Sequence, residues 1–149
     1  MTAALDALGA QRIDHGVGAA GDAAVVARLA RDGVLLTLCP LSNVRLGGFA
    51  AVRDVPVRRF LDAGVRFSLN SDDPAYFDGY VLDVYCAVQE AHDLAVDEWE
   101  TVARNALEGS WCGEERKAEI RAEVDRVFAR WRAGAGGGGG GGGDGGAEG

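Results

Sequence analysis

Hydrophobic and polar residues alternate along the first half of the chain in a repeated unit that predicts a helix, then a glycine, then a strand. Residues 23–32 place their apolar side chains on one face of a predicted helix, with Asp22 as its N-cap. Gly33 is placed to end this helix, and the largely apolar run 34–38 is typical of a parallel strand covered on both faces. Residues 62–65, Asp-Ala-Gly-Val, repeat the pattern of residues 31–34, Arg-Asp-Gly-Val. Strands that alternate with helices in this way predict an α/β fold with a parallel sheet.

The units on either side follow the same order. The first has a short predicted helix over residues 5–8 and a strand over residues 12–15. The third begins at Pro56, since proline is tolerated in the first turn of a helix, and it passes Gly64 to reach a strand over residues 65–69. We therefore expect three strands, each preceded by a helix.

Three longer helices are predicted in the second half of the chain. The first covers residues 80–91, and the second begins with Asp97 as N-cap and Glu100 as its capping-box partner. The third, over residues 114–131, is strongly amphipathic. Its apolar stripe, which we expect to face the core, consists of Ile120, Val124, Val127, Phe128 and Trp131.

Composition limits the class of protein. The chain has 149 residues and a formal net charge of −8, which argues against a nucleic-acid partner or an anionic membrane surface. We expect one domain over residues 1–133 and a disordered glycine-rich tail over residues 134–149. The chain shows no signal-peptide pattern, no apolar run of membrane-spanning length and no CxxC pair, so we expect a reduced, cytoplasmic setting.

Polar residues follow each of the three predicted strands. His15 closes the first strand, residues 39–43 follow the second, and residues 70–73 follow the third. Parallel strands point the same way, so these residues are expected to share the rim where α/β proteins bind ligands. A histidine together with Asp72 and Asp73 at one rim indicates a metal site or an acid–base site.

Simpler interpretations remain open for each of these residues. Asp72 and Asp73 precede a proline and are also typical of a turn. His15 is equally compatible with a capping or core role, and His92 with an ordinary surface position. We interpret Cys39 as a small buried apolar residue rather than a nucleophile.

The sequence resembles the adenosine/adenine deaminase family, a branch of the metal-dependent amidohydrolases. The resemblance rests on three motifs in chain order: Arg12-Ile13-Asp14-His15-Gly16, Cys39-Pro40-Leu41-Ser42-Asn43-Val44 and Ser68-Leu69-Asn70-Ser71-Asp72-Asp73-Pro74. It continues through residues 104–106 and 110–111 and covers nearly all of residues 1–133. It implies an incomplete (β/α)8 barrel, consisting of about strands six to eight and the C-terminal helices.

Asp14 and the residues around the other two motifs look like the adenine deaminase branch. The resemblance then implies hydrolytic deamination of adenine to hypoxanthine and ammonia by a zinc-bound hydroxide. Asp72 matches the carboxylate that ligates zinc, and His15 matches the histidine that orients or deprotonates the zinc-bound water. Asp73 matches the residue that contacts the attacking hydroxide and hydrogen-bonds the purine. Asp14 is expected to disfavour a ribose on the substrate.

Other parts of the family pattern have no counterpart in the chain. The family's two-histidine metal motif on the first strand, and its further histidine and catalytic glutamate on the fifth, are not in this sequence. Because Asp72 would hold zinc weakly as a single ligand, we expect no activity and poor metal retention from this chain in isolation. Deamination of adenosine or a modified adenine, a non-catalytic relic or interaction-only half barrel, and pairing with a missing N-terminal half are alternatives that the sequence leaves open.

Overall fold

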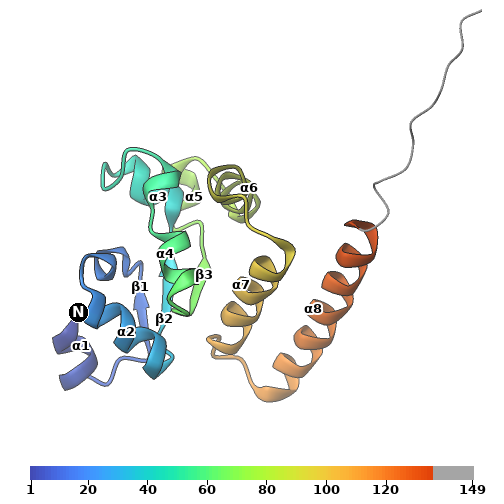
Figure 1. Cartoon of the computed structure of the whole chain (residues 1–149), viewed down its shortest axis with the longest axis horizontal. Helices are drawn as coiled ribbons and strands as arrows, with labels where there is room; N and C mark the ends of the chain where they lie inside the picture. The colour runs from blue at the N-terminus through green and yellow to red at the C-terminus, as the bar shows by residue number, and fades with distance from the viewer. Residues whose placement is uncertain (136–149) are drawn as a thin grey trace, which may run out of the picture.

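A three-stranded parallel sheet lies at the centre of the structure, a computed structural model that describes residues 1–135 (Figure 1). The strands are β1 (Arg12–Asp14), β2 (Leu35–Leu38) and β3 (Phe67–Leu69), with β2 in the middle. Asp14 pairs with Thr37, and Thr37 with Ser68, so the three strands end at nearly the same level. The predicted α/β fold with a parallel sheet is confirmed.

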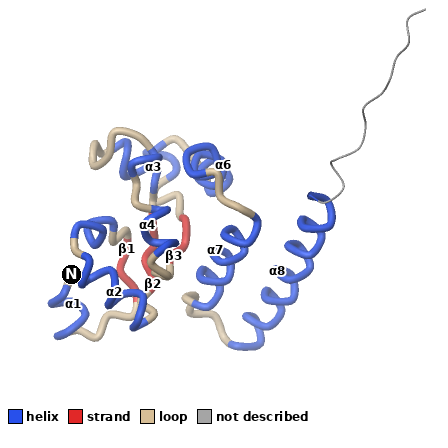
Figure 2. The backbone as a smooth tube through the Cα atoms, viewed as in Figure 1, coloured by secondary structure: helices blue, strands red, loops and turns tan. Residues whose placement is uncertain are grey.

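Helices surround the sheet. Figure 2 shows the strands between α1 and α2 on one side of the view and α7 and α8 on the other. The helices are α1 (Thr2–Ala7), η1 (Val17–Gly21), α2 (Ala23–Asp32), α3 (Pro40–Arg45), η2 (Val52–Asp54), α4 (Val57–Asp62), α5 (Pro74–Phe77), α6 (Val81–His92), α7 (Val96–Glu108) and α8 (Glu114–Ala135). Helix α7 packs on β3, and α8 packs on α7. Among residues 1–135, no helix combines the length and the apolar character needed to cross a bilayer.

The ends of α2 follow the sequence prediction. The Asp22 carboxylate accepts hydrogen bonds from the backbone N–H groups of Ala24 and Val25, at 2.9 and 3.2 Å. Gly33 ends the helix in the left-handed conformation, at φ 67°. These caps satisfy polar groups that the helix leaves unpaired at its ends and set the direction in which the chain enters β2.

The predicted capping box of α7 is wrong by two residues. The N-cap is Ala95, and Glu98 accepts a hydrogen bond of 2.8 Å from its backbone N–H. Asp97 and Glu100 instead both pair with Arg132 of α8. The acidic run Asp97-Glu98-Trp99-Glu100 offers more than one possible capping residue, so the sequence alone does not fix the helix start.

Two further helix boundaries differ from the sequence prediction. Pro56 is the N-cap of α4 rather than its first helical residue. Helix α8 continues over Gly134 and Ala135, two residues into the expected tail. The rest of that tail, residues 136–149, lies outside the described residues.

The core is built from the faces that the sequence pattern predicts, except along α8. Leu29, Leu36, Phe60 and Phe67 are fully buried between the sheet and its helices. In the apolar stripe of α8 only Phe128 is buried, whereas Val127 and Trp131 are 38% and 45% exposed. The amphipathic pattern therefore gives the correct helix but overestimates how much of it other residues cover.

Candidate metal and substrate site at the strand ends

The backbone pairing of the sheet continues one residue past β1 and β3. His15 N–H donates to the Thr37 carbonyl at 3.0 Å, and Asn70 N–H donates to the Leu38 carbonyl at 2.9 Å. This pairing holds the segments that follow the strands side by side. It brings His15 Nε2 to 3.5 Å from Asp72 Oδ2, although the two residues are 57 positions apart in the sequence.

The backbone at both of these residues is in the left-handed region, with φ 58° at His15 and at Asp72. Non-glycine residues adopt this conformation uncommonly, and it clusters at functional sites. Gly16 follows His15 at φ 73°, where a Cβ atom would lie 2.7 Å from Leu36 Cδ2. A glycine is needed here because the chain both turns left-handed and passes against the sheet.

A hydrogen bond from helix α3 orients the Asp72 carboxylate. Ser42 in that helix is fully buried, and its Oγ donates a hydrogen bond of 2.7 Å to Asp72 Oδ2. Helix α3 begins directly after Cys39, because Pro40 occupies its first position. The same short segment therefore places both the Cys39 thiol and the Ser42 hydroxyl beside Asp72.

Cys39 brings a third potential metal-ligand atom close to those of His15 and Asp72. One ligand atom each from His15, Cys39 and Asp72 lie within 4.8 Å of one another. The thiol also donates to the Thr37 carbonyl at 3.4 Å. Burial, and then the nearby charges of Asp72 and Asp14, raise the pKa of Cys39 to about 11, so the free site holds a thiol at neutral pH.

Asp14 faces the same pocket and is fixed by two donors. Arg12 Nε and Thr37 Oγ1 donate to its Oδ1 atom at 2.9 and 3.1 Å. The Arg12 guanidinium lies 4.1 Å from the ring centroid of Trp111, which supports it by a cation–π contact. The pocket has a volume of about 390 Å³. Its lining includes Asp14, His15, Thr37, Cys39, Asn70 and Asp72.

Asp73 does not line this pocket. It is the N-cap of α5, and its Oδ1 accepts a long hydrogen bond of 3.4 Å from Tyr76 N–H. The two adjacent aspartates therefore make different contacts, since Asp72 faces His15 and Asp73 caps α5. The role of Asp73 as a substrate ligand stays a prediction.

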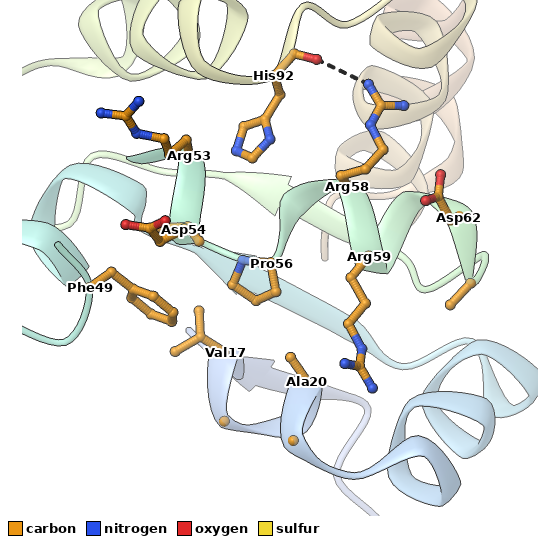
Figure 3. A pocket seen from close by; sticks show the side chains of 14 residues that line it. Val17, Ala20, Phe49, Arg53, Asp54, Pro56, Arg58, Arg59, Asp62 and His92 are labelled. Carbon is orange, nitrogen blue, oxygen red and sulfur yellow. Dashed lines mark hydrogen bonds between the residues drawn. The ribbon is translucent and has the colours of Figure 1, made fainter. Parts of the chain in front are cut away.

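A larger hollow lies elsewhere on the molecule, on the side of η1 and α4 (Figure 3). It has a volume of about 1140 Å³ and includes Arg53, Arg58, Arg59 and His92 in its lining. Figure 3 shows these side chains pointing to different sides rather than toward one another. His92 Nε2 lies 3.1 Å from the Val52 carbonyl, and Arg58 donates to the His92 carbonyl at 3.1 Å. These contacts tie His92, at the end of α6, to η2 and α4.

A comparison with known families decides the affiliation of the chain. The sequence profile described as "Adenosine deaminase" matches residues 1–127. The chain belongs to the adenosine deaminase family. His15, Cys39 and Asp72 lie together at the carboxyl ends of the strands, as the parallel order of the strands predicted.

Individual relatives support the same family. An adenine deaminase from Aspergillus oryzae is 55% identical over 125 residues, which cover 84% of this chain and 35% of the relative. The crystal structure of an adenine deaminase from Arthrobacter aurescens is 41% identical, with a TM-score of 0.82, and the match covers 86% of this chain and 39% of that one. This chain therefore spans about a third of the length of the relatives it matches.

A third solved structure is similar to this chain in fold but only distantly in sequence. The structure of an amidohydrolase from Burkholderia ambifaria, which has bound zinc, is 23% identical with a TM-score of 0.75. The match covers 86% of this chain and 36% of that one. Its likeness places the sheet and helices of this chain among the amidohydrolase folds.

Sequence reasoning did not find two of the groups that organise the site. Ser42 lies inside the second motif, but nothing in its spacing indicates a bond to a residue 30 positions later. The sequence places residues 39–43 at the rim but favours Cys39 as a small buried apolar residue. Cys39 is buried, at 5% exposure, and its thiol nevertheless lies beside His15 and Asp72.

Proposed function

We propose that the chain supplies strands six to eight of a (β/α)8 barrel and, with them, part of the active site of an adenine deaminase. Within residues 1–135 the sheet ends at β1 on one side and at β3 on the other, with parallel pairing on the inner side only. Closed barrels have no such edges. The similarity to an adenine deaminase structure over 39% of its length supports the same arrangement.

The observation that carries this proposal is the approach of His15 Nε2 to Asp72 Oδ2, at 3.5 Å, in a pocket that Asp14 also lines. In the proposed reaction, water adds to the amine-bearing carbon of adenine, the bond to nitrogen breaks, and hypoxanthine and ammonia are formed. An imidazole can accept and return a proton near neutral pH, so His15 is proposed to orient the attacking water and take its proton.

The rim residues fit the zinc ion that the family implies. The Asp72 carboxylate is an oxygen ligand of the kind that zinc accepts, and His15 Nε2, 3.5 Å from it, stays free to take a proton from water. Zinc lowers the pKa of water and so supplies a nucleophile near neutral pH. Asp72 is the residue that we propose holds it in the assembled enzyme, with its carboxylate oriented by Ser42.

Asp14 is proposed to select adenine over adenosine. Its Oδ1 is taken up by Arg12 and Thr37, which leaves the other oxygen to accept a hydrogen bond from the substrate. The imidazole ring of free adenine carries an N–H that can donate this bond. In adenosine the ribose occupies that nitrogen, so the substrate would lose the bond and bring a bulky group against a carboxylate.

Asp73 is proposed to contact the attacking water and the purine, as the resemblance implies. In this structure its carboxylate caps α5 through a bond of 3.4 Å to Tyr76 N–H. A bond of that length is weak, so a short rotation of the side chain could exchange it for a substrate contact.

The proposed partner in catalysis is the N-terminal part of the barrel, which pairs with the edges of β1 and β3. The chain alone is proposed to have no measurable turnover, because the family's other metal ligands and its catalytic glutamate have no counterpart in the sequence. A reduced, cytoplasmic setting is supported by the unpaired state of Cys39, Cys86 and Cys112.

A chimera tests this function. Residues 1–135 would replace the matching region of the Aspergillus oryzae adenine deaminase, and hypoxanthine formation from adenine would be followed. We expect turnover within about tenfold of the parent enzyme, since the replaced region is 55% identical. A chimera that folds but leaves adenine unchanged, beside an active parent, would overturn the proposal. The chain alone is the matched control, and it is expected to form no hypoxanthine.

A further inference from the structure

We propose that Trp111, acting through Arg12, is a positioning residue for Asp14 and so helps to set the choice of adenine over adenosine. The inference rests on the role proposed above for Asp14. It adds that this role depends on an aromatic residue in the connection between α7 and α8, which does not line the substrate pocket. A continuous series of contacts runs from Trp111 to Arg12 and from Arg12 to Asp14.

The direction of the Asp14 carboxylate depends on its hydrogen-bond donors. Arg12 and Asp14 are two positions apart in β1, so their side chains lie on the same face of the sheet. The Asp14 side chain is 66% exposed, and packing therefore restricts its rotation little. The bonds that its Oδ1 atom accepts from Arg12 Nε and Thr37 Oγ1 decide where its other oxygen points.

Arg12 needs support of its own to hold this position. Fixing a long arginine side chain costs rotamer entropy, which a second contact offsets. The guanidinium lies 4.1 Å from the centroid of the Trp111 ring, within the range of a cation–π contact. Trp111 is 76% exposed, so burial in the core does not account for its position, whereas the contact with Arg12 does.

The connection between α7 and α8 is packed against the start of the sheet. Gly109 follows α7, and a Cβ atom there would lie 2.5 Å from Leu35 Cδ2. Leu35 pairs with Arg12 in the register of β1 and β2. The close approach of Gly109 to the sheet thus brings Trp111, two residues later, beside Arg12.

Two hollows meet at the pair of Arg12 and Asp14. One is the substrate pocket, and the other has a volume of about 340 Å³ and is lined by Gly9, Gln11, Arg12, Asp14 and Trp111. Without the indole ring, the guanidinium gains room to turn into the second hollow and away from Asp14. A change at Trp111 therefore acts on the substrate pocket through this pair, with no contact between Trp111 and the substrate.

The test measures kcat/KM for adenine and for adenosine in the chimera with the Aspergillus oryzae enzyme. Trp111→Leu keeps an apolar side chain but removes the aromatic face, and the ratio for adenine over adenosine is expected to fall about 3- to 10-fold. The loss is expected as a higher KM for adenine with little change in kcat, because Asp14 binds the purine and moves no proton. Partial unfolding would instead lower the apparent kcat for both substrates equally and leave the ratio unchanged.

Three further variants make the test specific. Trp111→Phe keeps an aromatic face and is expected to hold the ratio within about twofold. Trp131→Leu is the matched control, because Trp131 is also partly exposed but stacks on Phe128 and does not line either hollow. Trp111→Leu combined with Asp14→Gly is expected to lower the ratio no further than Asp14→Gly alone, since the effect passes through Asp14.

The inference is overturned by an unchanged ratio in Trp111→Leu, by an equal fall in Trp131→Leu, or by a full additional fall when Asp14→Gly is already present. If Trp111→Leu fails to fold, Arg12→Met decides the matter, because it removes the donor to Asp14 and is expected to lower the ratio about tenfold. A chimera that deaminates adenine with a ratio insensitive to both changes leaves the proposed function standing and rejects this inference. A folded chimera without turnover rejects both.

Discussion

Ser42, fully buried in α3, donates a hydrogen bond of 2.7 Å to Asp72, which lies in the exposed turn after β3. The bond links helix α3, which follows β2, to the proposed metal ligand, which follows β3. Because Asp72 has a left-handed backbone and few other restraints, this hydroxyl fixes the direction of the carboxylate. The relationship makes α3 part of the site, although its sequence reads as an ordinary helix start.

Removing the hydroxyl tests that role. In the chimera with the Aspergillus oryzae enzyme, Ser42→Ala is expected to weaken zinc binding about 10- to 100-fold, since the carboxylate loses its orienting partner. Competition for zinc with a chelator measures the change. Ser110→Ala is the matched control, because its hydroxyl donates to the Leu107 carbonyl away from the pocket. Equal zinc affinities for Ser42→Ala and the unmodified chimera would show that Asp72 needs no such support.

Gly16 is expected to be the most sensitive glycine of the rim. Gly16→Ala places a Cβ atom 2.7 Å from Leu36 Cδ2 at a φ of 73°, which combines a clash with backbone strain. We expect the free energy of unfolding to fall by about 2–4 kcal/mol, measured by urea denaturation.

The matched control separates the two causes. Gly9 has a similar φ of 59°, but a Cβ atom there meets nothing within 4 Å. Gly9→Ala is expected to cost only the backbone strain, about 1 kcal/mol. If both variants lose the same stability, the contact with Leu36 contributes nothing.

The pattern of hydrophobic residues was enough to predict the sheet, the order of its units and the shared rim. It could not predict the individual contacts made there. The hydrogen bond from Ser42 to Asp72 and the approach of the Cys39 thiol depend on the direction in which α3 leaves β2, which the local hydrophobic pattern does not determine. Asp73 illustrates the same limit, since its capping of α5 and its implied substrate role are both compatible with one Asp-Pro sequence.

Two predictions from the sequence were wrong: the residue at which α7 begins and the burial of the apolar stripe of α8. Asp97 and Glu100 pair with Arg132 of α8, whereas Glu98 bonds the backbone N–H of the N-cap Ala95. The stripe of α8 is apolar enough to be a core face, yet Trp131 remains 45% exposed, because burial depends on partners rather than on periodicity.

The partly buried position of His92 predicts a dependence of stability on pH. Burial, with a smaller contribution from the charge of Arg58, lowers the pKa of His92 below its usual value of 6.5, against an opposing hydrogen bond to Val52. The unfolded chain then binds a proton more readily than the folded chain. The contribution of His92 is therefore complete above about pH 6.5 and is lost as the pH falls below it.

His92→Gln removes this titration. The variant is expected to show a smaller fall in the free energy of unfolding between pH 7 and pH 5.5 than the unmodified chain, in urea titrations at each pH. An identical fall in both proteins would mean that other groups account for the acid sensitivity.

Substrate choice is expected to depend on Asp14. In the chimera with the Aspergillus oryzae enzyme, Asp14→Gly opens the pocket and removes the acceptor for the purine N–H. The ratio of kcat/KM for adenine to that for adenosine is expected to fall by about 10- to 100-fold, as for the loss of one hydrogen bond to a substrate. An unchanged ratio would place the discrimination against ribose elsewhere in the pocket.

The most direct test of the account is adenine turnover by the chimera with and without the Asp72 carboxylate. Asp72→Ala is expected to lower hypoxanthine formation by at least about 1000-fold and to abolish stoichiometric zinc, because the proposed ligand and its bond to Ser42 are both lost. Asp78→Ala is the control, since this exposed aspartate contacts only Arg45 among the ion pairs of the described residues. A folded Asp72→Ala chimera that keeps its zinc and more than about a tenth of its turnover would contradict the assignment of the site.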